Sequence, residues 1–418
     1  MLKTPIARGV ALATLGASLA IPSMAQAEFL KDSKASLEMR NFYFNADNRQ
    51  SGLASEDSKS EEWAQGFILR YESGFTEGTV GFGLDAIGLL GVKLDSSPDR
   101  TGSGMLPVGS DGRTDDDMSA FGPTFKARIS KSTLKVGTLI PKLPTVLPTD
   151  SRILPQTFRG AHINSGEIKN LTVDLGRLTE NSLRSEAGYE DLTATNVSGG
   201  KATDKFDFAS ASYKWGDSGL TTSYNYGHLD ENYKQHIVNL LHVLPISEGQ
   251  SLKTDLRYAR STEDGNANVD NKAIGAMFTY SLSGHSFGLG YQDMSGDTAY
   301  PYITGTDAFL VNYVMIDPAF ADADEKSWQA RYDYNFAAMG IPGLTFMTRY
   351  VKGEDFGANG NGEEWERDTD IAYVIQGGPL KNLGIKWRNG SYRGETAAGA
   401  DREIDQNRLI VSYTLPLL

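Results

Sequence analysis

The chain reads Leu383-Gly384-Ile385-Lys386-Trp387-Arg388 near its C-terminal end, where apolar residues alternate with glycine and cationic residues. The last residues, from Arg408 to Leu415, alternate in the same way. Successive side chains of a β-strand point to opposite faces of the sheet. Each stretch therefore predicts a strand with an apolar environment on one face and water or counter-charge on the other. A soluble sandwich core and a lipid bilayer can both provide this.

The first residues favour the bilayer. Cationic residues precede an apolar stretch from Gly9 to Ala20, and Ala25-Gln26-Ala27 supplies the small residues that a signal peptidase requires. We therefore interpret residues 1–27 as a secretory signal peptide and residues 28–418 as one outer-membrane β-barrel domain. No later stretch approaches the ~18 uninterrupted apolar residues of a membrane helix.

Composition excludes several classes of protein. Cysteine is absent and only 5 histidines are present, which leaves no disulfide and little for a metal centre, so we expect no cofactor. A hydrophobic content of 39% is too low for a helical membrane protein but suits strands with one polar face. The net charge of −13 argues against a nucleic-acid partner, because phosphates would be repelled.

Alternating segments recur along the whole chain and predict an all-β fold, a transmembrane antiparallel β-barrel. With two weaker candidates, Leu134–Gly137 and Leu220–Asn225, we expect about 16 to 18 strands, which enclose an aqueous lumen. Aromatic residues begin or end many segments, as in the girdles at membrane interfaces. The clear segments are Leu37–Tyr43, Trp63–Tyr71, Val80–Ala86, Phe121–Ile129, Leu171–Arg177, Phe206–Trp215, Tyr233–Val243, Leu252–Tyr258, Ile274–Tyr280, Phe287–Tyr291, Phe309–Met315, Trp328–Tyr334, Leu344–Tyr350, Ile371–Ile375, Leu383–Arg388 and Arg408–Leu415.

Long polar connections between the segments are predicted to lie outside the cell. One of them, Asp95–Ser119, holds six aspartates whose carboxylates could chelate calcium. Their spacing fits no calcium-loop template, so we favour a solvated acidic loop. The connections are Asn45–Glu62, Asp95–Ser119, Glu180–Asp204, Asp293–Asp307, Lys352–Arg367 and Gly390–Asp405.

One segment, Thr138–Gly160, departs from the alternation because it holds four prolines within fifteen residues. Proline fixes φ and cannot donate to a strand ladder, so this segment cannot be a central strand. It is also too apolar for a freely solvated loop. We expect it to fold onto the inner wall of the barrel as a constriction loop, with Asp150 and Arg152 projecting into the constriction.

The proline segment Leu143-Pro144-x-x-Leu147-Pro148-Thr149-Asp150-Ser151-Arg152-Ile153-Leu154-Pro155 resembles the constriction loop of the OprD family of substrate-specific outer-membrane channels. Nearly the whole mature chain shares the resemblance. The family implies an eighteen-stranded barrel, an eyelet formed by inward loops, and a ladder of basic wall residues that guides a substrate carboxylate. Of its branches, we favour the channels for cyclic or aromatic monocarboxylates over those for basic amino acids. The other matching segments are Leu37–Tyr43, Gly83–Asp95, Lys326–Asp333, Gly343–Tyr350 and Arg408–Tyr413.

The basic ladder can also be argued from the alternation. If the apolar residues face lipid, a set of cations faces the lumen. This placement is favourable, because a charge that faces lipid at mid-membrane costs roughly 2–4 kcal/mol. Clustered cations repel each other unless an anion binds between them, and arginine can donate two hydrogen bonds to one carboxylate. These lumen cations are Arg40, Arg70, Arg349, Lys386, Arg388 and Arg408. The predicted substrate path consists of Arg40, Arg152, Arg349, Lys386, Arg388 and Arg408, with Asp150 and Asp307 as an acidic side that favours zwitterions.

Two further motifs suggest functions other than a channel for small organic carboxylates. Near Gly160–Gly166, His162, Asn164 and Ser165 are the residue types of an outer-membrane phospholipase, but strand geometry points Ser165 away from His162. The Gly81–Ala86 stretch fits a dinucleotide motif only formally, since that motif requires a βαβ unit. A general diffusion porin of low selectivity remains the alternative. We expect no catalysis, contact with outer-membrane lipid, and a monomer or loose homotrimer.

Overall fold

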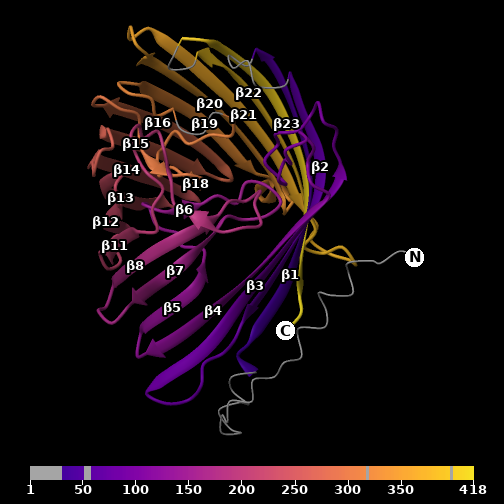
Figure 1. Ribbon diagram of the computed structural model, residues 1–418, viewed down its shortest axis with the longest axis vertical. Coiled ribbons are helices and arrows are strands. Elements are labelled where there is room, and N and C mark those ends of the chain that lie inside the picture. The colour runs from indigo at the N-terminus through magenta and orange to yellow at the C-terminus, as the bar shows by residue number, and fades with distance from the viewer. Residues whose placement is uncertain (1–30, 51–57, 317–319, 396–398) are drawn as a thin grey trace.

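The computed structural model describes residues 31–50, 58–316, 320–395 and 399–418, so the predicted signal peptide lies outside the described residues. Within these ranges, nineteen strands join in one sheet, and all of its pairings are antiparallel. Without β9 (Glu190–Asp191), a two-residue strand beside β8, eighteen strands build the wall. The first and last strands pair with each other, with Arg40 opposite Ser412, which closes the sheet into a barrel (Figure 1).

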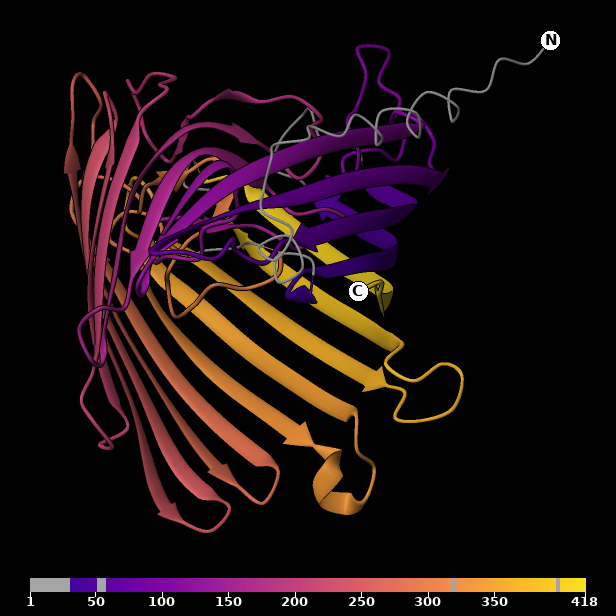
Figure 2. The same ribbon diagram turned by 90° about the horizontal axis from the view of Figure 1, so that it is seen from below.

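The wall strands follow one another around the barrel in chain order (Figure 2). They are β1 (Lys34–Gln50), β2 (Lys59–Glu72), β3 (Val80–Asp95), β4 (Asp117–Ile129), β5 (Ser132–Leu139), β7 (Thr157–Ser165), β8 (Leu171–Ser182), β11 (Phe206–Lys214), β12 (Leu220–Leu229), β13 (Tyr233–Ser247), β14 (Gln250–Glu263), β15 (Asp270–Leu282), β16 (His285–Ser295), β19 (Lys326–Asn335), β20 (Leu344–Phe356), β21 (Gly362–Val374), β22 (Gly384–Glu395) and β23 (Asp401–Pro416). A short 3-10 helix, η2 (Phe336–Met339), joins β19 to β20.

Apolar side chains cover the outside of the wall. In β16, the exposed residues Phe287, Leu289 and Tyr291 alternate with the buried Gly288, Gly290 and Gln292. Such a surface suits lipid on the outside and a filled or wet interior. Among the described residues, no helix is long and apolar enough to cross a membrane.

Several predicted polar connections are strands for most of their length. Residues of Asn45–Glu62, Lys352–Arg367 and Gly390–Asp405 belong to the strand pairs β1–β2, β20–β21 and β22–β23. These strand pairs extend beyond the apolar band of the wall. Water lies on both faces of the extended part, so its residues are polar although the strands are paired. Short turns close the opposite end, which faces the periplasm in barrels of this kind.

Two strand assignments were wrong and offset each other in the count. Phe309–Met315 is not a wall strand but part of a loop, and it is apolar because residues such as Leu310 and Val314 are buried inside the barrel. Conversely, β7 (Thr157–Ser165) is a wall strand that the alternation did not reveal. Few of its residues are large and apolar, so it carries little of the lipid-facing signal.

Two loops fold inward. The proline loop (residues 140–156) connects β5 to β7, and its Ile153 and Leu154 are completely buried among Phe42, Phe44 and Ile68 of the wall. The inner loop (residues 296–316 and 320–325) connects β16 to β19. The loops pair with each other through β6 (Leu147–Pro148) and β18 (Thr306–Asp307), which lie between the barrel walls (Figure 1).

The inner loop also pairs with the loop between β8 and β11. In this second contact, β10 (Ala194–Thr195) pairs with β17 (Tyr302–Ile303) of the inner loop. The predicted inward-folded, proline-rich loop is therefore present, but it is one of three connected segments. Together with the wall, these segments narrow the lumen.

Candidate functional site

Polar residues meet where the two inward loops approach β1 and β20–β23. The wall contributes an acidic row on β21, because Glu364, Glu366, Asp368 and Asp370 follow one another at every second position and are all buried. Basic residues on β20, β22 and β23 lie beside this row. The site is therefore a mixed array of charges, not a purely basic ladder.

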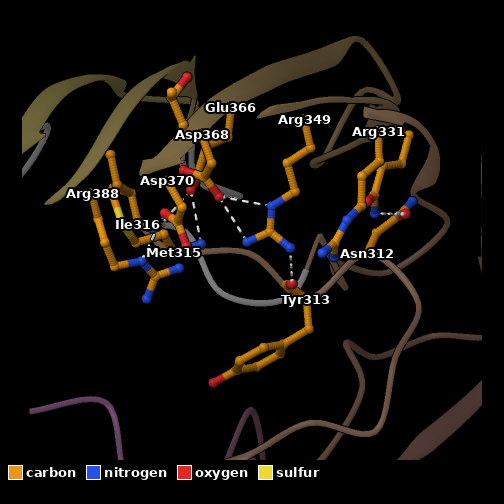
Figure 3. A network of polar contacts seen from close by, with 12 residues as sticks. Asn312, Tyr313, Met315, Ile316, Arg331, Arg349, Glu366, Asp368, Asp370 and Arg388 are labelled. Carbon is orange, nitrogen blue, oxygen red and sulfur yellow. Dashed lines mark hydrogen bonds and ion pairs between the residues drawn. The ribbon is translucent and has the colours of Figure 1, made fainter. Parts of the chain in front are cut away.

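Arg349 of β20 is held by the acidic row and by the inner loop (Figure 3). Its Nη2 lies 2.7 Å from Oδ2 of Asp368, whose side chain is completely buried. Its Nη1 donates to the backbone oxygen of Tyr313 at 2.9 Å. Arg349 is thus neutralised and anchors the inner loop to the wall.

Two other carboxylates of the row, Glu366 and Asp370, bind different partners (Figure 3). Oε1 of Glu366 accepts the backbone N–H groups of Met315 and Ile316, at 2.9 and 2.8 Å, and fixes the inner loop. Asp370 binds two cations of β22: Nζ of Lys386 and Nε of Arg388 each lie 2.9 Å from its carboxylate oxygens. The Arg388 side chain keeps 20% of its area exposed and that of Lys386 keeps 40%. Both can therefore be reached from the lumen.

Arg40 of β1 binds the proline loop to the wall. Its Nη1 donates to Oδ1 of Asp150 and to the backbone oxygen of Arg152, both at 2.7 Å. Its Nη2 lies 2.6 Å from Glu38, which also pairs with Arg70. Arg40 and Asp150 are therefore joined to each other in this structure.

Arg152 does not project into open lumen. It is 8% exposed, stacks over the ring of Phe44, and donates from Nε to the backbone oxygen of Ser103 in the acidic loop (residues 96–116) at 2.7 Å. Burial, reinforced by the nearby guanidinium groups of Arg408, Arg184 and Arg388, holds the pKa of Arg152 well below its usual range.

Three arginines of the site lack a carboxylate partner within the described residues: Arg152, Arg184 and Arg408. Arg184 lies in the segment between β8 and β11 and donates to Oγ of Ser151 at 2.7 Å, and burial lowers its pKa. Arg408, on β23, donates to Gln406 and to the backbone oxygen of Met315 at 2.9 Å. Their hydrogen-bond acceptors are neutral. The carboxylates that attract them, Asp307 for Arg184 and Asp368 and Glu366 for Arg408, form no hydrogen bond with them in the described part of the chain.

Asp307 lies on β18 in the inner loop, at the contact with the proline loop. The Tyr313 hydroxyl donates to its Oδ1 at 2.7 Å. Burial, together with the Asp307 charge, raises the pKa of Tyr313, which therefore remains a neutral donor. The Tyr313 ring points away from Arg349 and from the acidic row (Figure 3).

The acidic row, Arg184 and Tyr313 were not among the residues predicted from the sequence. A signal for the row was present, since Glu364-Trp365-Glu366-Arg367-Asp368-Thr369-Asp370 alternates with a period of two. Arg184 and Tyr313 lie in irregular segments, where no period tells which way a side chain points.

The weighed alternatives find no support in the geometry. Ser165 is bonded to Ser132, 2.9 Å between hydroxyl oxygens, while His162 is bonded to Asp174 at 2.9 Å. Gly81 and Gly83 are needed for space, because a Cβ at either would lie within 3 Å of a backbone oxygen of the turn between β2 and β3. Neither motif forms a catalytic or nucleotide site.

The acidic loop does not bring three donors together within the described residues. In the part of the chain that the structure describes, the one group that could ligate a metal lies elsewhere. It comprises His228, Asp230 and Asp264, at the turns that follow β12 and β14. Nζ of Lys234 already lies 2.6 Å from Asp264. The predicted solvated acidic loop holds for its aspartates, since Asp111 and Asp116 are exposed, but Met105 and Leu106 are buried in the barrel.

Comparisons with known proteins agree with this architecture. Residues 27–417 match the model of the family described as outer membrane porin, OprD family. The porin-like protein GalP of Pseudomonas putida is 37% identical over 407 residues, covering 97% of each chain. The crystal structure of Pseudomonas aeruginosa OpdQ is 59% identical with a TM-score of 0.84, covering 94% of this chain and 100% of that one.

A further crystal structure, of Pseudomonas aeruginosa OpdK with vanillate, is 38% identical with a TM-score of 0.86, covering 93% of this chain and 100% of that one. These relatives are channels, not enzymes. The chain therefore belongs to the OprD family of substrate-specific porins of the bacterial outer membrane.

Proposed function

We propose that this channel carries small organic carboxylates, with aromatic or cyclic monocarboxylates as the preferred class. The observation that carries the proposal is the cluster of Arg152, Arg184 and Arg408, whose charges have only neutral acceptors among the described residues. Like charges held close in a partly dry site repel one another, so an entering anion is stabilised.

Arg184 of the cluster, and Arg388 beside it on β22, are the residues that a carboxylate would meet. Both retain exposed area, whereas Arg152 and Arg408 are buried behind them. The buried pair would contribute field, and the exposed pair would form charge-assisted hydrogen bonds, which arginine can make in pairs.

The preference for an aromatic or cyclic body rests on the relatives. OpdK, 38% identical to this chain, has been solved with vanillate, an aromatic monocarboxylate. The carboxylates Asp150 and Asp307, on the two inward loops, would add an acidic side that tolerates a zwitterion. We keep a monomer or loose homotrimer as the predicted assembly.

Single-channel currents in planar bilayers test the proposal, with benzoate and arginine titrated against chloride. Wild-type current should saturate with benzoate, and Arg184→Gln and Arg388→Gln should each weaken the apparent affinity by about tenfold, the equivalent of one charge-assisted hydrogen bond. The matched control is Lys253→Gln, because Lys253 faces the lumen from β14 on a distant part of the wall. Large, linear currents that respond to none of these changes would identify a general diffusion porin instead.

A further inference from the structure

A cavity lies below the proline loop, on the side of the periplasmic turns. Its volume is about 690 Å³, and it is bounded by the proline loop on one side and by the inner faces of β2–β5 and β7 on the other. This lower cavity has the size of a ligand site for a small molecule. The side chains of the arginine cluster and of Arg388 do not line it, so it is separate from the binding site of the proposed function.

The two sides of the lower cavity differ in chemistry. The proline loop contributes an apolar surface, including Ile140 and Pro141. The wall contributes cations, Lys126 of β4 and Lys135 of β5, which are directly opposite each other in the strand register. A solute with a flat apolar body and one anionic group would match both sides.

One carboxylate, Asp85 of β3, shares these two lysines. It lies 2.5 Å from Nζ of Lys126 and 3.2 Å from Nζ of Lys135. Lys126 is 6% exposed and also donates to the backbone oxygen of Ser73, so it holds the turn between β2 and β3 against the wall. Lys135 makes the longer contact and keeps 42% of its side-chain area exposed, which leaves donors for a ligand.

A further cation enters from the loop side. Lys142 of the proline loop lines the same cavity, is exposed, and forms no ion pair within the described residues. Two other carboxylates also line the cavity. Asp150 is bound by Arg40, and Glu72 lies at the end of β2, beside the periplasmic turn. Arg70 of β2 lines the cavity too, but it is paired with Glu38. Lys142, without an ion pair among the described residues, and Lys135, with its long contact, are thus the cations most available to an incoming anion.

The floor of the cavity is an aromatic ring. The exit turn (residues 73–79), between β2 and β3, folds onto the inner wall, where Gly83 leaves room: a Cβ there would lie 2.8 Å from the backbone oxygen of Gly74. This turn carries Phe75, whose ring centroid is 4.7 Å from Nζ of Lys126 and 4.3 Å from Cζ of Arg128. Phe75 lines both the lower cavity and a second hollow beside it that contains Arg128.

We propose that the lower cavity is a second binding site for the transported anion, used after the arginine cluster and before release into the periplasm. The carboxylate would bind Lys135 and Lys142, and the apolar body would lie between Pro141 and Phe75. The site deepens the proposed function and rests on it, because it takes the same class of substrate. Two weak binding sites in series allow the channel to select a solute twice. Because each site binds weakly, the solute still dissociates quickly.

Residence times of benzoate in single channels test this second site. The wild type should show two classes of blocked state. The double variant Lys135→Gln/Lys142→Gln should shorten one class by about tenfold and leave the other, because charge-assisted hydrogen bonds are lost at one site only. Phe75→Ala should shorten the same class, and Phe75→Tyr, which keeps the ring, should not.

The controls separate this proposal from the proposed function. Lys253→Gln, which removes a lumen lysine elsewhere, should change neither class, and Arg184→Gln should shorten only the class that survives in the double lysine variant. If the lysine variant and Phe75→Ala both keep two unchanged classes, or if the wild type shows one class, the lower site is wrong while the arginine site stands. If Arg184→Gln changes no class, it is the proposed function that fails.

Discussion

Arg349 and Asp368 face each other across β20 and β21, with Nη2 2.7 Å from Oδ2, and the Asp368 side chain is completely buried. The pair shows how a lumen cation becomes part of the scaffold. Arg349 also donates to the backbone oxygen of Tyr313, so one guanidinium group joins a wall strand to the inner loop. A basic residue that faces the lumen is therefore not automatically a substrate ligand.

Replacing Arg349 should destabilise the channel. In Arg349→Met, Asp368 would be buried without its partner, which typically costs about 3–5 kcal/mol, and the inner loop would lose an anchor. We expect a lower unfolding temperature and noisier single-channel current. Both can be measured on purified protein, by heat-dependent gel mobility and in planar bilayers.

A matched substitution and a rescue identify the cause. Arg331→Met on neighbouring β19 removes an arginine whose partner Asp333 is more exposed, so it should cost about 1 kcal/mol or less. The double variant Arg349→Met/Asp368→Leu removes both charges and should recover most of the stability. If Arg349→Met is as stable as Arg331→Met, the buried pair does not anchor the loop.

Gly66 makes room for the proline loop. A Cβ at Gly66 would lie 2.5 Å from the backbone oxygen of Ile153, so Gly66→Ala must displace the loop backbone. Overpacking of this kind typically costs about 1–3 kcal/mol. We expect Gly66→Ala to lower stability and to change single-channel conductance, because Ile153 belongs to the proline loop, which narrows the lumen.

Gly88 provides the control for that substitution. A Cβ there would be 3.6 Å from the nearest atom, in Leu69, which is an ordinary contact. Gly88→Ala should leave conductance unchanged and stability within about 0.5 kcal/mol. Equal behaviour of the two variants would show that the proline loop does not depend on the glycine.

Much of the barrel could be predicted from the sequence because one physical constraint acts on every strand: lipid on one face and water or loops on the other. As expected, Gly384–Arg388 lies in β22, with Leu383 directly before it, and Arg408–Leu415 lies in β23. The constraint fails for Phe309–Met315, since a loop buried inside the barrel is as apolar as a strand that faces lipid. It also fails for β7, whose outer face carries little apolar surface.

The site was less predictable than the barrel. The period of two gives the face of Arg349, Arg388 and Arg408 but not their partners. Asp368 of β21 pairs with Arg349, and Asp370 pairs with Arg388, which keeps 20% of its side-chain area exposed. Arg152 was assigned to the right loop, but its burial against Ser103 depends on a contact between residues 49 positions apart. No local pattern encodes such contacts.

Asp307 should set the balance between simple anions and zwitterions. Its carboxylate lies close enough to oppose the effect of burial on the pKa of Arg184. Removing its charge in Asp307→Asn should strengthen benzoate binding by roughly threefold or more and weaken arginine binding, since like charges no longer repel the anion. Saturation of single-channel current with each solute measures both effects.

The control for Asp307 is another aspartate with the same net change in charge. Asp293→Asn alters β16 at a position between the buried Gln292 and Met294, so its side chain points out of the barrel. It should leave both affinities unchanged. If the two variants give the same currents, Asp307 does not act at the constriction.

Asp264, in the turn between β14 and β15, ties two rim hairpins together and should do so down to low pH. Burial alone would raise its pKa, but hydrogen bonds from Lys234, His228 and the Glu231 N–H lower it to about 2, from an ordinary value of 3.8. A lowered pKa stabilises the folded form above the ordinary value, and this stabilisation is lost as pH falls through the folded one. The contact should therefore persist at pH 4 and open near pH 2.

Hydrogen exchange at the Glu231 amide reports on this contact, since that N–H donates to Oδ2 of Asp264 at 3.0 Å. Its protection relative to the Asp230 amide, which donates to the backbone oxygen of Lys205, should fall between pH 4 and pH 2. In Asp264→Asn the protection should be weak at both values, because an amide cannot replace the charge that holds Lys234. Protection that is equal at pH 4 and pH 2 in the wild type would mean that the carboxylate charge does not maintain the rim contact.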